Sequence, residues 1–318
     1  MRSSEAGLLA DIGGTNARFA LQAQGGSPAS VRVLHSADFP SLESAAKSYL
    51  AGVGARPKRG AFAVASPVTG DRIEMTNHPW SFSIDAMRER LALDDLVVVN
   101  DFEAIAWSIP LIPRDQVRRI GGGEAVAGAP VAIIGPGTGL GVAALIDGRP
   151  VASEGGHVTL PATDAREAEA IARIRARLGH VSAERALSGP GLCNLYRALG
   201  NGGEPPDPDE ITRRALRAAE PRAKEALDMF CAMLGTVAGN LALTLGARGG
   251  VYIAGGIVRK LGEYFTGSRF RDRFEDKGRF RDYLEPIPVY VIEAEMPALL
   301  GLAALLEERD LAHHGHAP

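Results

Sequence analysis

The distribution of apolar and polar residues along the chain predicts alternating strands and helices. Apolar runs of strand length lie at residues 8–10, 17–21, 61–65, 96–99, 131–134, 142–146, 251–254 and 288–292. Segments with a helical spacing of apolar residues lie at 41–50, 102–108, 165–178, 224–245 and 299–307. Because the two kinds of segment alternate, the sequence predicts an α/β fold with helices on both faces of its sheets.

Two of the predicted strands run into glycine-rich turns and then into a returning strand. The first turn spans residues 11–16 and the second spans 135–139. Glycines let main-chain N–H groups approach phosphate oxygens, so both turns are candidates for phosphate binding. A tight hairpin alone would use the same glycines, and this alternative stays open for each turn. Neither turn matches a P-loop or a dinucleotide fingerprint, because Gly-Lys-Ser/Thr is absent and the second turn leads into a strand.

Polar residues directly after an apolar strand are the first candidates for chemistry. Asn100 and Asp101 follow the strand at 96–99, where open α/β sheets place their active residues. A carboxylate at this position could orient an alcohol and accept its proton during phosphoryl transfer. Asp101 could instead cap the helix that follows. Asp11, at the end of the first strand, could lie near a phosphate-bound Mg²⁺ and contribute through water.

A second set of polar residues lies further along the chain. Glu154 and His157 flank two glycines, and Glu184 follows Ser182 at a predicted helix start. Carboxylate and imidazole groups can hydrogen-bond to sugar hydroxyls. A structural histidine, and an acidic residue that favours a helix N-terminus, are the alternatives. The glycine pair Gly255-Gly256 follows the buried strand at 251–254 and extends the phosphate-loop pattern.

Composition limits the possible partners. The 318 residues are 46% hydrophobic, which is enough for two lobes, and prolines at 110 and 113 mark the expected boundary. We expect lobes of residues 1–111 with 300–318, and 112–299. A net charge of −3 does not favour nucleic acid, so small molecules are the expected partners. No stretch reaches the ~20 apolar residues of a membrane span, so we expect a cytoplasmic protein without a membrane partner.

Two distant cysteines support neither a disulfide framework nor a zinc site. The histidines at 313–316 are interpreted as a polar chain end.

Ten short segments, in order along the chain, resemble those of the bacterial glucokinase family. They are LADIGGTNAR at 9–18, MTNHPW at 75–80, NDF at 100–102, GTGLGV at 137–142, EGGHV at 154–158, HVSAER at 180–185, LSGPG at 187–191, GNLAL at 239–243, IAGGI at 253–257 and FEDKGRF at 274–280. Each glycine segment alone is weakly specific, but the ordered combination, from about residue 8 to about 302, is highly specific.

This resemblance implies an actin-like ATPase (ribonuclease H-like) fold with two α/β lobes and a cleft between them. It implies an ATP-dependent and Mg²⁺-dependent kinase that phosphorylates the 6-hydroxyl of glucose and forms a homodimer. It also implies that Asp101 is the general base and that the other sugar hydroxyls are bound by Asn100, Glu154, His157 and Glu184. The first phosphate loop that it implies consists of Ala10, Asp11, Ile12, Gly13, Gly14 and Thr15, and the second consists of Gly137, Thr138 and Gly139. The adenosine part of ATP would be bound by Gly255 and Gly256.

The chain departs from the family pattern at one position. Ala10 stands where the family usually has glycine, and an added methyl group there is compatible with ATP binding. A related group of sugar kinases and repressors carries a cysteine-rich zinc motif that this chain lacks. Two alternative functions remain at this stage. They are a kinase for another hexose or an N-acetylamino sugar, and a non-catalytic sugar sensor on the same fold.

Overall fold

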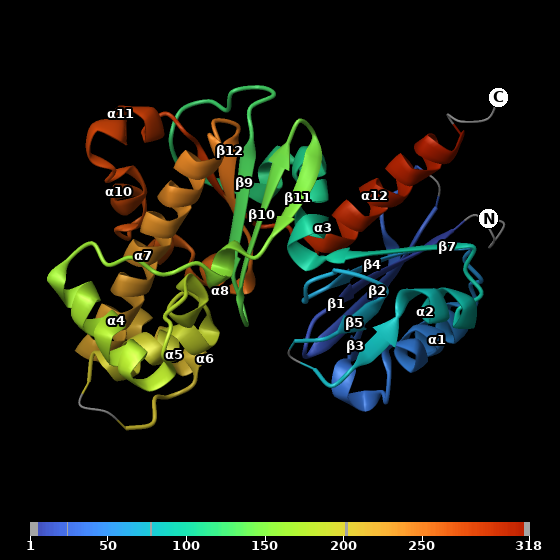
Figure 1. The fold of residues 1–318 in the computed structure, drawn as a ribbon, viewed down its shortest axis with the longest axis horizontal. Coiled ribbons are helices and arrows are strands. Elements are labelled where there is room, and N and C mark those ends of the chain that lie inside the picture. The colour runs from blue at the N-terminus through green and yellow to red at the C-terminus, as the bar shows by residue number, and fades with distance from the viewer. Residues whose placement is uncertain (1–5, 24, 77, 201–202, 315–318) are drawn as a thin grey trace. The chain divides into compact units, whose positions relative to one another are not determined.

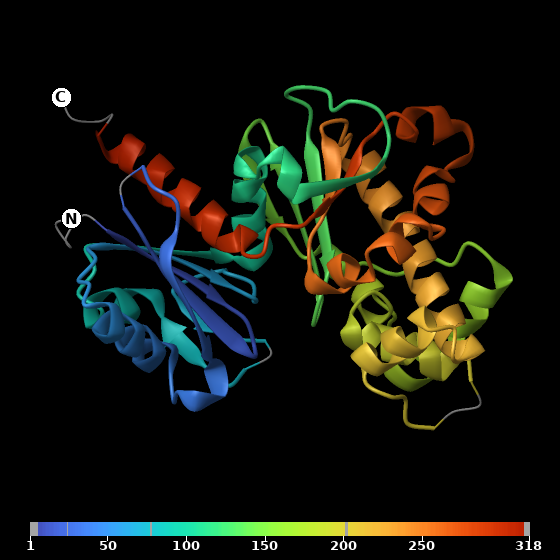
Figure 2. The ribbon, with the colours of Figure 1, turned by 180° about the vertical axis from the view of Figure 1, so that it is seen from behind.

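The computed structural model describes residues 6–23, 25–76, 78–200 and 203–314. Asn77 and His316, which are discussed above, lie outside these ranges. The chain divides into two compact units, Met1–Pro113 with Ala294–Pro318, and Arg114–Glu293 (Figures 1 and 2). The first unit therefore includes residues 112–113 and 294–299 in addition to those assigned to it from the sequence.

The first unit is built on a twisted mixed sheet. In the described part of the chain this sheet has five strands, in the order β3-β2-β1-β4-β7. The strands are β1 (Gly7–Ile12), β2 (Asn16–Gln22), β3 (Ala29–His35), β4 (Arg59–Val64) and β7 (Asp95–Asn100). β1 and β2 form the predicted antiparallel hairpin, whereas β1, β4 and β7 run parallel. The carboxyl ends of these three parallel strands therefore lie at one edge of the sheet.

Helices cover both faces of this sheet, as the alternating pattern predicts (Figure 1). Leu8, Ala10 and Ile12 alternate along β1 and pack with Leu42 and Tyr49 of the helix on one face. On the other face α12 (Pro297–His314) contacts β1, β4 and α3 (Asp101–Ser108). A small hairpin of β5 (Arg72–Glu74) and β6 (Ser81–Ser83) precedes the second helix. The helices of this unit are α1 (Leu42–Val53), α2 (Ile84–Arg90), α3 (Asp101–Ser108) and α12 (Pro297–His314).

The second unit contains a larger mixed sheet. Its six strands, counted over the described residues, have the order β11-β10-β9-β12-β13-β8. They are β8 (Val117–Gly121), β9 (Val131–Pro136), β10 (Leu140–Ile146), β11 (Arg149–Ser153), β12 (Gly250–Ile253) and β13 (Val289–Ile292). β9 and β10 form the second predicted hairpin, and β9 and β12 run parallel. The glycine turn after β9 and the glycine pair after β12 consequently lie at the same sheet edge.

A long apolar helix, α7 (Pro221–Leu245), organises the helical part of the second unit. It contacts β9 and β12 and packs against its neighbours α5 (Gly189–Ala198), α6 (Pro208–Leu216) and α10 (Phe270–Glu275). Contrary to the sequence-based expectation, α7 is long and apolar enough to cross a membrane, but 78% of its most apolar window is buried inside the structure. Burial of this kind is typical of a core helix. The other helices are α4 (Ala165–Leu178), α5 (Gly189–Ala198), α6 (Pro208–Leu216), α8 (Gly256–Leu261), α9 (Glu263–Thr266), α10 (Phe270–Glu275) and α11 (Arg281–Leu284).

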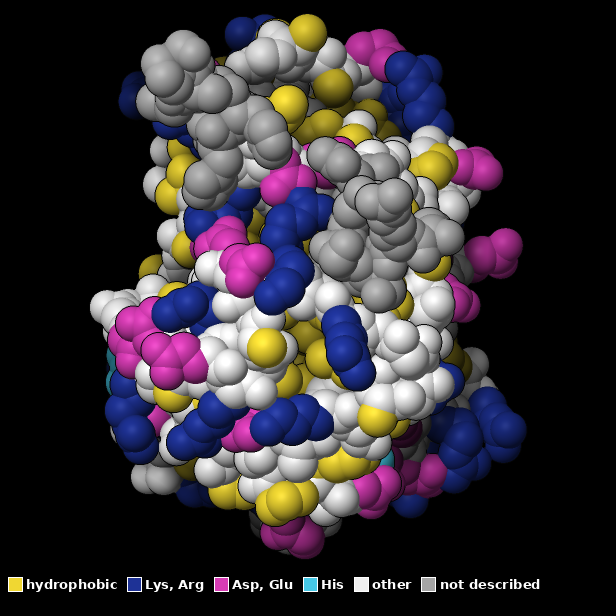
Figure 3. All heavy atoms as spheres, turned by 90° about the vertical axis from the view of Figure 1, so that its right-hand side faces the viewer, with side chains coloured by type: hydrophobic (Ala, Val, Ile, Leu, Met, Phe, Trp, Pro, Cys, Tyr) yellow, Lys and Arg dark blue, Asp and Glu magenta, His cyan; other side chains and the backbone are white. Residues whose placement is uncertain are grey.

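The surface carries charges of both signs. On the face drawn in Figure 3, outside the grey atoms, Lys and Arg side chains lie among Asp and Glu side chains, and hydrophobic side chains are scattered between them. This mixture agrees with the net charge of −3. Cys193 and Cys231 are both free thiols, as expected from their spacing, and burial raises the pKa of Cys231 to about 12.

Candidate active site

In the first unit, the candidate residues meet at the carboxyl edge of the parallel strands. Ile12 at the end of β1 is in register with Val64 of β4, and Val64 is in register with Asn100 of β7. Neighbouring strands lie about 4.8 Å apart, so the ends of β1 and β7 are roughly 10 Å apart. The first glycine turn and Asp101 therefore belong to one short stretch of sheet edge.

Asn100 and Asp101 mark the passage from β7 into α3. Asn100 is the N-cap of this helix, since its Oδ1 accepts the N–H of Phe102 at 2.9 Å. Asp101 is the first helical residue, and its Oδ1 accepts the same N–H at 3.0 Å. The alternative in which Asp101 is the cap is thus wrong, because the residue before it has the extended backbone that a cap requires. Asp101 is only partly buried.

Asp11 is held by a neighbour that the hairpin places opposite it. In the β1–β2 register Asp11 pairs with Arg18, and Arg18 Nη1 donates to Asp11 Oδ2 at 3.0 Å. Burial raises the pKa of the Asp11 carboxyl, and the charge and hydrogen bond of Arg18 oppose that rise. Arg18 thus favours the ionised form of the carboxylate next to the first glycine turn.

In the second unit, the second glycine turn lies beside the glycine pair at 255–256. β9 and β12 are parallel neighbours, and Ala254 N–H donates to Ile134 O at 2.9 Å. Gly255 has a φ of +96°, and a Cβ at this position would lie 2.4 Å from Pro136 O. Only glycine fits this backbone conformation without strain. The main chain at Gly255 therefore approaches the strand that leads into the turn at Gly137–Gly139.

Glu154, His157 and Glu184 are brought together in the same unit. His157 Nε2 lies 3.6 Å from Glu154 Oε2, and His157 Nδ1 lies 4.0 Å from Glu184 Oε1. The side chains are 53%, 57% and 33% exposed for Glu154, His157 and Glu184. Because more than half of the His157 side chain is exposed, it is not a core residue, and the alternative of a structural histidine satisfied by its neighbours stays open. The three groups form an accessible polar cluster that can accept and donate hydrogen bonds.

Glu184 also lies at a helix start, but not as a cap of it. It belongs to the short 3-10 helix Ala183–Arg185, whose N-cap Ser182 makes no side-chain capping bond. The carboxylate of Glu184 instead accepts the N–H of Leu140 at 2.9 Å, through Oε2. The alternative in which the Glu184 charge only favours the helix N-terminus therefore does not account for its hydrogen bond with Leu140 N–H.

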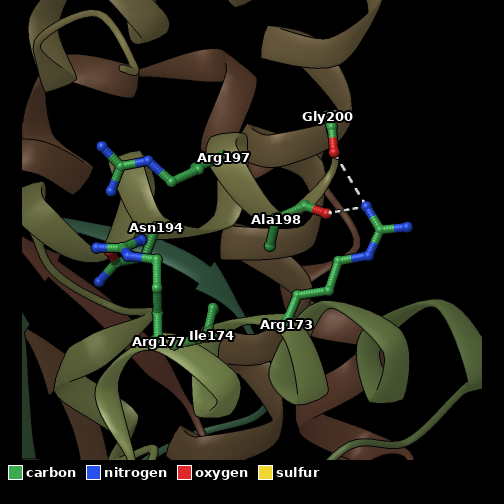
Figure 4. A pocket seen from close by; sticks show the side chains of 7 residues that line it. All are labelled: Arg173, Ile174, Arg177, Asn194, Arg197, Ala198 and Gly200. Atoms are coloured by element: carbon green, nitrogen blue, oxygen red, sulfur yellow. Dashed lines mark hydrogen bonds between the residues drawn. The ribbon is translucent and has the colours of Figure 1, made fainter. Parts of the chain in front are cut away.

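A pocket of about 290 Å³ in the second unit includes none of the candidate residues. It lies between α4 and α5 and is lined by Arg173, Ile174, Arg177, Asn194, Arg197, Ala198 and Gly200 (Figure 4). Arg173 donates to the carbonyl groups of Ala198 and Gly200 at 2.9 and 3.0 Å, and so satisfies the C-terminal end of α5. These two contacts of Arg173 thus serve the end of the helix.

Comparison with known proteins identifies the family. The family model described as glucokinase matches residues 8–309. A curated glucokinase from Aromatoleum aromaticum is 55% identical over 312 residues, which cover 94% of each chain. The chain belongs to the glucokinase family. Among solved structures, a glucokinase from an Antarctic psychrotroph is 35% identical, with a TM-score of 0.85 and coverage of 96% of this chain and 99% of that one.

A more distant glucokinase shares the fold. The ROK family glucokinase from Streptomyces griseus, solved in complex with glucose and AMPPNP, is 21% identical with a TM-score of 0.65, and the match covers 94% of this chain and 98% of that one. Membership of the glucokinase family confirms the predicted resemblance, the actin-like α/β fold and, of the predicted function, the phosphorylation of glucose. The chain is a sugar kinase, an enzyme that phosphorylates glucose.

Sequence reasoning missed several partners of the site residues in this glucokinase. Ser66 follows β4 and accepts the N–H of Thr76 through Oγ at 2.8 Å, while its carbonyl accepts Asn100 Nδ2 at 3.4 Å. A serine directly after a predicted buried strand was the available signal. Arg18 could have been found from the hairpin register. The contact between Glu184 and Leu140 had no sequence signal.

Proposed function

We propose that this chain transfers the γ-phosphate of ATP to the 6-hydroxyl of D-glucose, with Asp101 as the general base. The observation that carries the proposal is the position of Asp101, on the first turn of α3 at the sheet edge that also carries the first glycine turn. Phosphoryl transfer to an alcohol needs a carboxylate at the hydroxyl and fixed donors at the phosphates. The first unit supplies both.

The reaction then follows from these groups. The Asp101 carboxylate orients the 6-hydroxyl and accepts its proton as the sugar oxygen attacks the γ-phosphorus. The bond between this phosphorus and the β–γ bridging oxygen breaks, and ADP leaves. Main-chain N–H groups of Gly14 and Thr15 in the first loop and of Thr138 and Gly139 in the second hold the phosphate oxygens and stabilise the charge that develops on them, since Gly13 N–H already donates to Asn16 O and Gly137 N–H to Gly139 O.

The other residues bind and orient the two substrates. We assign the remaining sugar hydroxyls to Asn100 and to the polar cluster of Glu154, His157 and Glu184, whose mutual distances of 3.6 and 4.0 Å support a common ligand. Gly255 and Gly256 are assigned to the adenosine part of the nucleotide. ATP as the donor is supported by the Streptomyces griseus relative, because AMPPNP is an analogue of ATP.

Asp11 is the residue that we assign to Mg²⁺. Within the described ranges, no three or more His, Cys, Asp and Glu side chains are arranged so that they could hold a metal ion, so the ion would take most of its oxygens from phosphate and water. The Asp11 carboxylate is placed for this use, because it lies near the end of β1 beside the first glycine turn, where Arg18 Nη1 donates to it at 3.0 Å. When bound, Mg²⁺ would neutralise phosphate charge.

A coupled assay of ADP release across glucose, mannose, fructose and N-acetylglucosamine tests the proposal. We expect kcat/KM for glucose to exceed the others by at least about tenfold, and ADP release to stop when Mg²⁺ is chelated. A higher kcat/KM for another sugar would support the alternative hexose or N-acetylamino sugar kinase. Glucose binding without ADP release would support the sensor.

Two further properties are proposals, of which the first rests on the family resemblance. We propose a homodimer, which light scattering of the purified chain would test. We also propose a cytoplasmic location, with which the buried α7 agrees.

The glycine pair at 255–256 offers a matched test of nucleotide binding. In Gly255→Ala we expect a loss of stability of about 1–3 kcal/mol, because the φ of +96° strains alanine and its Cβ meets Pro136 O. In Gly256→Ala the added Cβ has no neighbour within 4 Å, so the melting temperature should not fall. If the adenosine assignment is right, Gly256→Ala raises KM for ATP and leaves KM for glucose unchanged. An unchanged KM for ATP would contradict it.

A further inference from the structure

One carboxylate in the second unit contacts both the polar cluster and the second glycine turn. Glu184 Oε1 lies 4.0 Å from His157 Nδ1, on the side of the proposed sugar ligands. Glu184 Oε2 accepts the main-chain N–H of Leu140 at 2.9 Å. Leu140 is the residue directly after Gly137–Gly139 and begins β10. The two oxygens of one side chain therefore face two different parts of the proposed site.

Further main-chain contacts hold Leu140 and the second glycine turn in place beside the polar cluster. Leu140 O faces the segment of the polar cluster, since a Cβ on Gly156 would lie 2.0 Å from it. At the start of the turn, Gly137 O accepts the N–H of Gly189 at 2.8 Å, and Gly137 N–H donates to Gly139 O at 2.8 Å. Hydrogen bonds therefore hold both ends of the turn: Gly189 N–H binds Gly137 O at its start, and Glu184 binds Leu140 N–H at its end. A displacement of the Glu184 carboxylate would move an N–H group at the exit of the turn.

We propose that Glu184 is a positioning residue for the second phosphate loop as well as a sugar ligand, so that one carboxylate couples glucose binding to nucleotide binding. This inference rests on the function proposed above. A sugar hydroxyl bound to Glu184 restricts its side chain, and the restricted carboxylate holds Leu140 N–H and the turn in one arrangement. Coupling of this kind is reciprocal, so a nucleotide that fixes the turn also tightens glucose binding.

The two glycines of the turn give a matched pair of variants. A Cβ on Gly139 would lie 2.5 Å from Glu184 Oε2, so alanine at this position must displace the carboxylate. A Cβ on Gly137 has no neighbour within 4 Å. Neither glycine has a positive φ, so alanine is not strained by the backbone at either position. The variants differ in whether they disturb Glu184, and both change the same proposed phosphate loop.

The first experiment measures glucose binding to the full chain by calorimetry, without nucleotide. Gly139→Ala is expected to weaken glucose binding by roughly tenfold, and Gly137→Ala by less than about twofold. Equal glucose affinity of Gly139→Ala and wild type would overturn the coupling, as would equal losses in both variants. If wild type itself does not bind glucose, the proposed function fails instead, so the two failures are distinguishable.

A second pair of variants does not depend on the folding of Gly139→Ala. Glu184→Ala removes the acceptor of Leu140 N–H, whereas Glu184→Gln keeps an acceptor oxygen of the same reach and removes the charge. At saturating glucose, we expect Glu184→Ala to raise KM for ATP by roughly tenfold and Glu184→Gln to restore it to within about threefold of wild type. A residue that only binds sugar would leave KM for ATP unchanged in both variants, and that result would refute the positioning role.

Discussion

The Asp101→Asn variant is expected to keep its fold and to lose at least about 10²-fold in kcat for glucose, since general-base catalysis contributes roughly 10²- to 10⁴-fold. Asparagine has the same shape and can still orient a hydroxyl, but it cannot accept the proton. The fold should survive because asparagine retains an Oδ1 for the N–H of Phe102, and Asn100 caps the same N–H independently. The measurement is the coupled assay at saturating ATP, with circular dichroism as the check on folding.

Glu103→Gln is the matched control for Asp101→Asn. Glu103 is an acidic residue of the same first turn of α3; burial raises the pKa of its carboxyl and the main-chain N–H of Asn100 opposes that rise, so glutamine keeps an oxygen of the same reach and removes only the charge. If Asp101 acted only by placing negative charge near the helix start, removal of either charge would have a similar effect. We expect kcat of Glu103→Gln to stay within about threefold of wild type. A turnover of Asp101→Asn within ~10-fold of wild type, or roughly 1.4 kcal/mol of barrier, would exclude the general-base role.

The sheet edges and the turns between strands were predictable from local sequence. Apolar runs followed by glycines predicted the β1–β2 and β9–β10 hairpins, because glycine turns and strand-length apolar runs need no long-range information. The same rule located Asn100 and Asp101 at the end of a buried strand. Ser41, the first residue of the predicted helical segment at 41–50, is the N-cap of α1, and its Oγ accepts the N–H of Ser44 at 3.1 Å.

Elements without an apolar run were missed. β3 is an edge strand of the first sheet and is almost entirely exposed, so its residues show no pattern that marks a strand. α5 begins with Gly189-Pro190-Gly191, which reads as a loop from the sequence. In the structure Ser188 caps this helix and Pro190 lies in its first turn, where its missing N–H has no cost.

The contacts that connect the site residues were also out of reach. Glu184 and Leu140 are 44 residues apart, and the hydrogen bond between them depends on how η5 (Ala183–Arg185) packs beside β10. The family resemblance implies that Glu184 is a sugar ligand, but a pattern of residue types carries no information about the second oxygen of a carboxylate. The partner of that oxygen, Leu140 N–H, is determined by the fold.

A buried ion pair in the second unit is expected to have the largest effect on stability. Arg273 of α10 is 4% exposed and Glu167 of α4 is 3% exposed, and Arg273 Nη1 lies 2.9 Å from Glu167 Oε1. Arg273 Nη2 also donates to Thr236 of α7 at 3.0 Å, and Glu167 accepts the N–H of Thr163 at 2.8 Å. The pair therefore joins three helices and leaves few of its polar atoms unsatisfied. From the sequence, Glu167 is an ordinary acidic residue in the first turn of a helix.

Replacing one partner leaves the other charge buried without compensation, so Arg273→Met should destabilise the fold by about 3–5 kcal/mol. The double variant Glu167→Met with Arg273→Met removes both charges and fills their volume, so we expect it to regain most of this loss. Arg166→Ala is the control, because Arg166 is 44% exposed in its pair with Glu225 and such surface pairs contribute at most about 1 kcal/mol. Urea unfolding followed by circular dichroism gives the three midpoints. An Arg273→Met urea midpoint no lower than that of Arg166→Ala would show that the buried pair does not stabilise the packing of α4, α7 and α10. In that case the apolar residues around α7 alone hold these helices together.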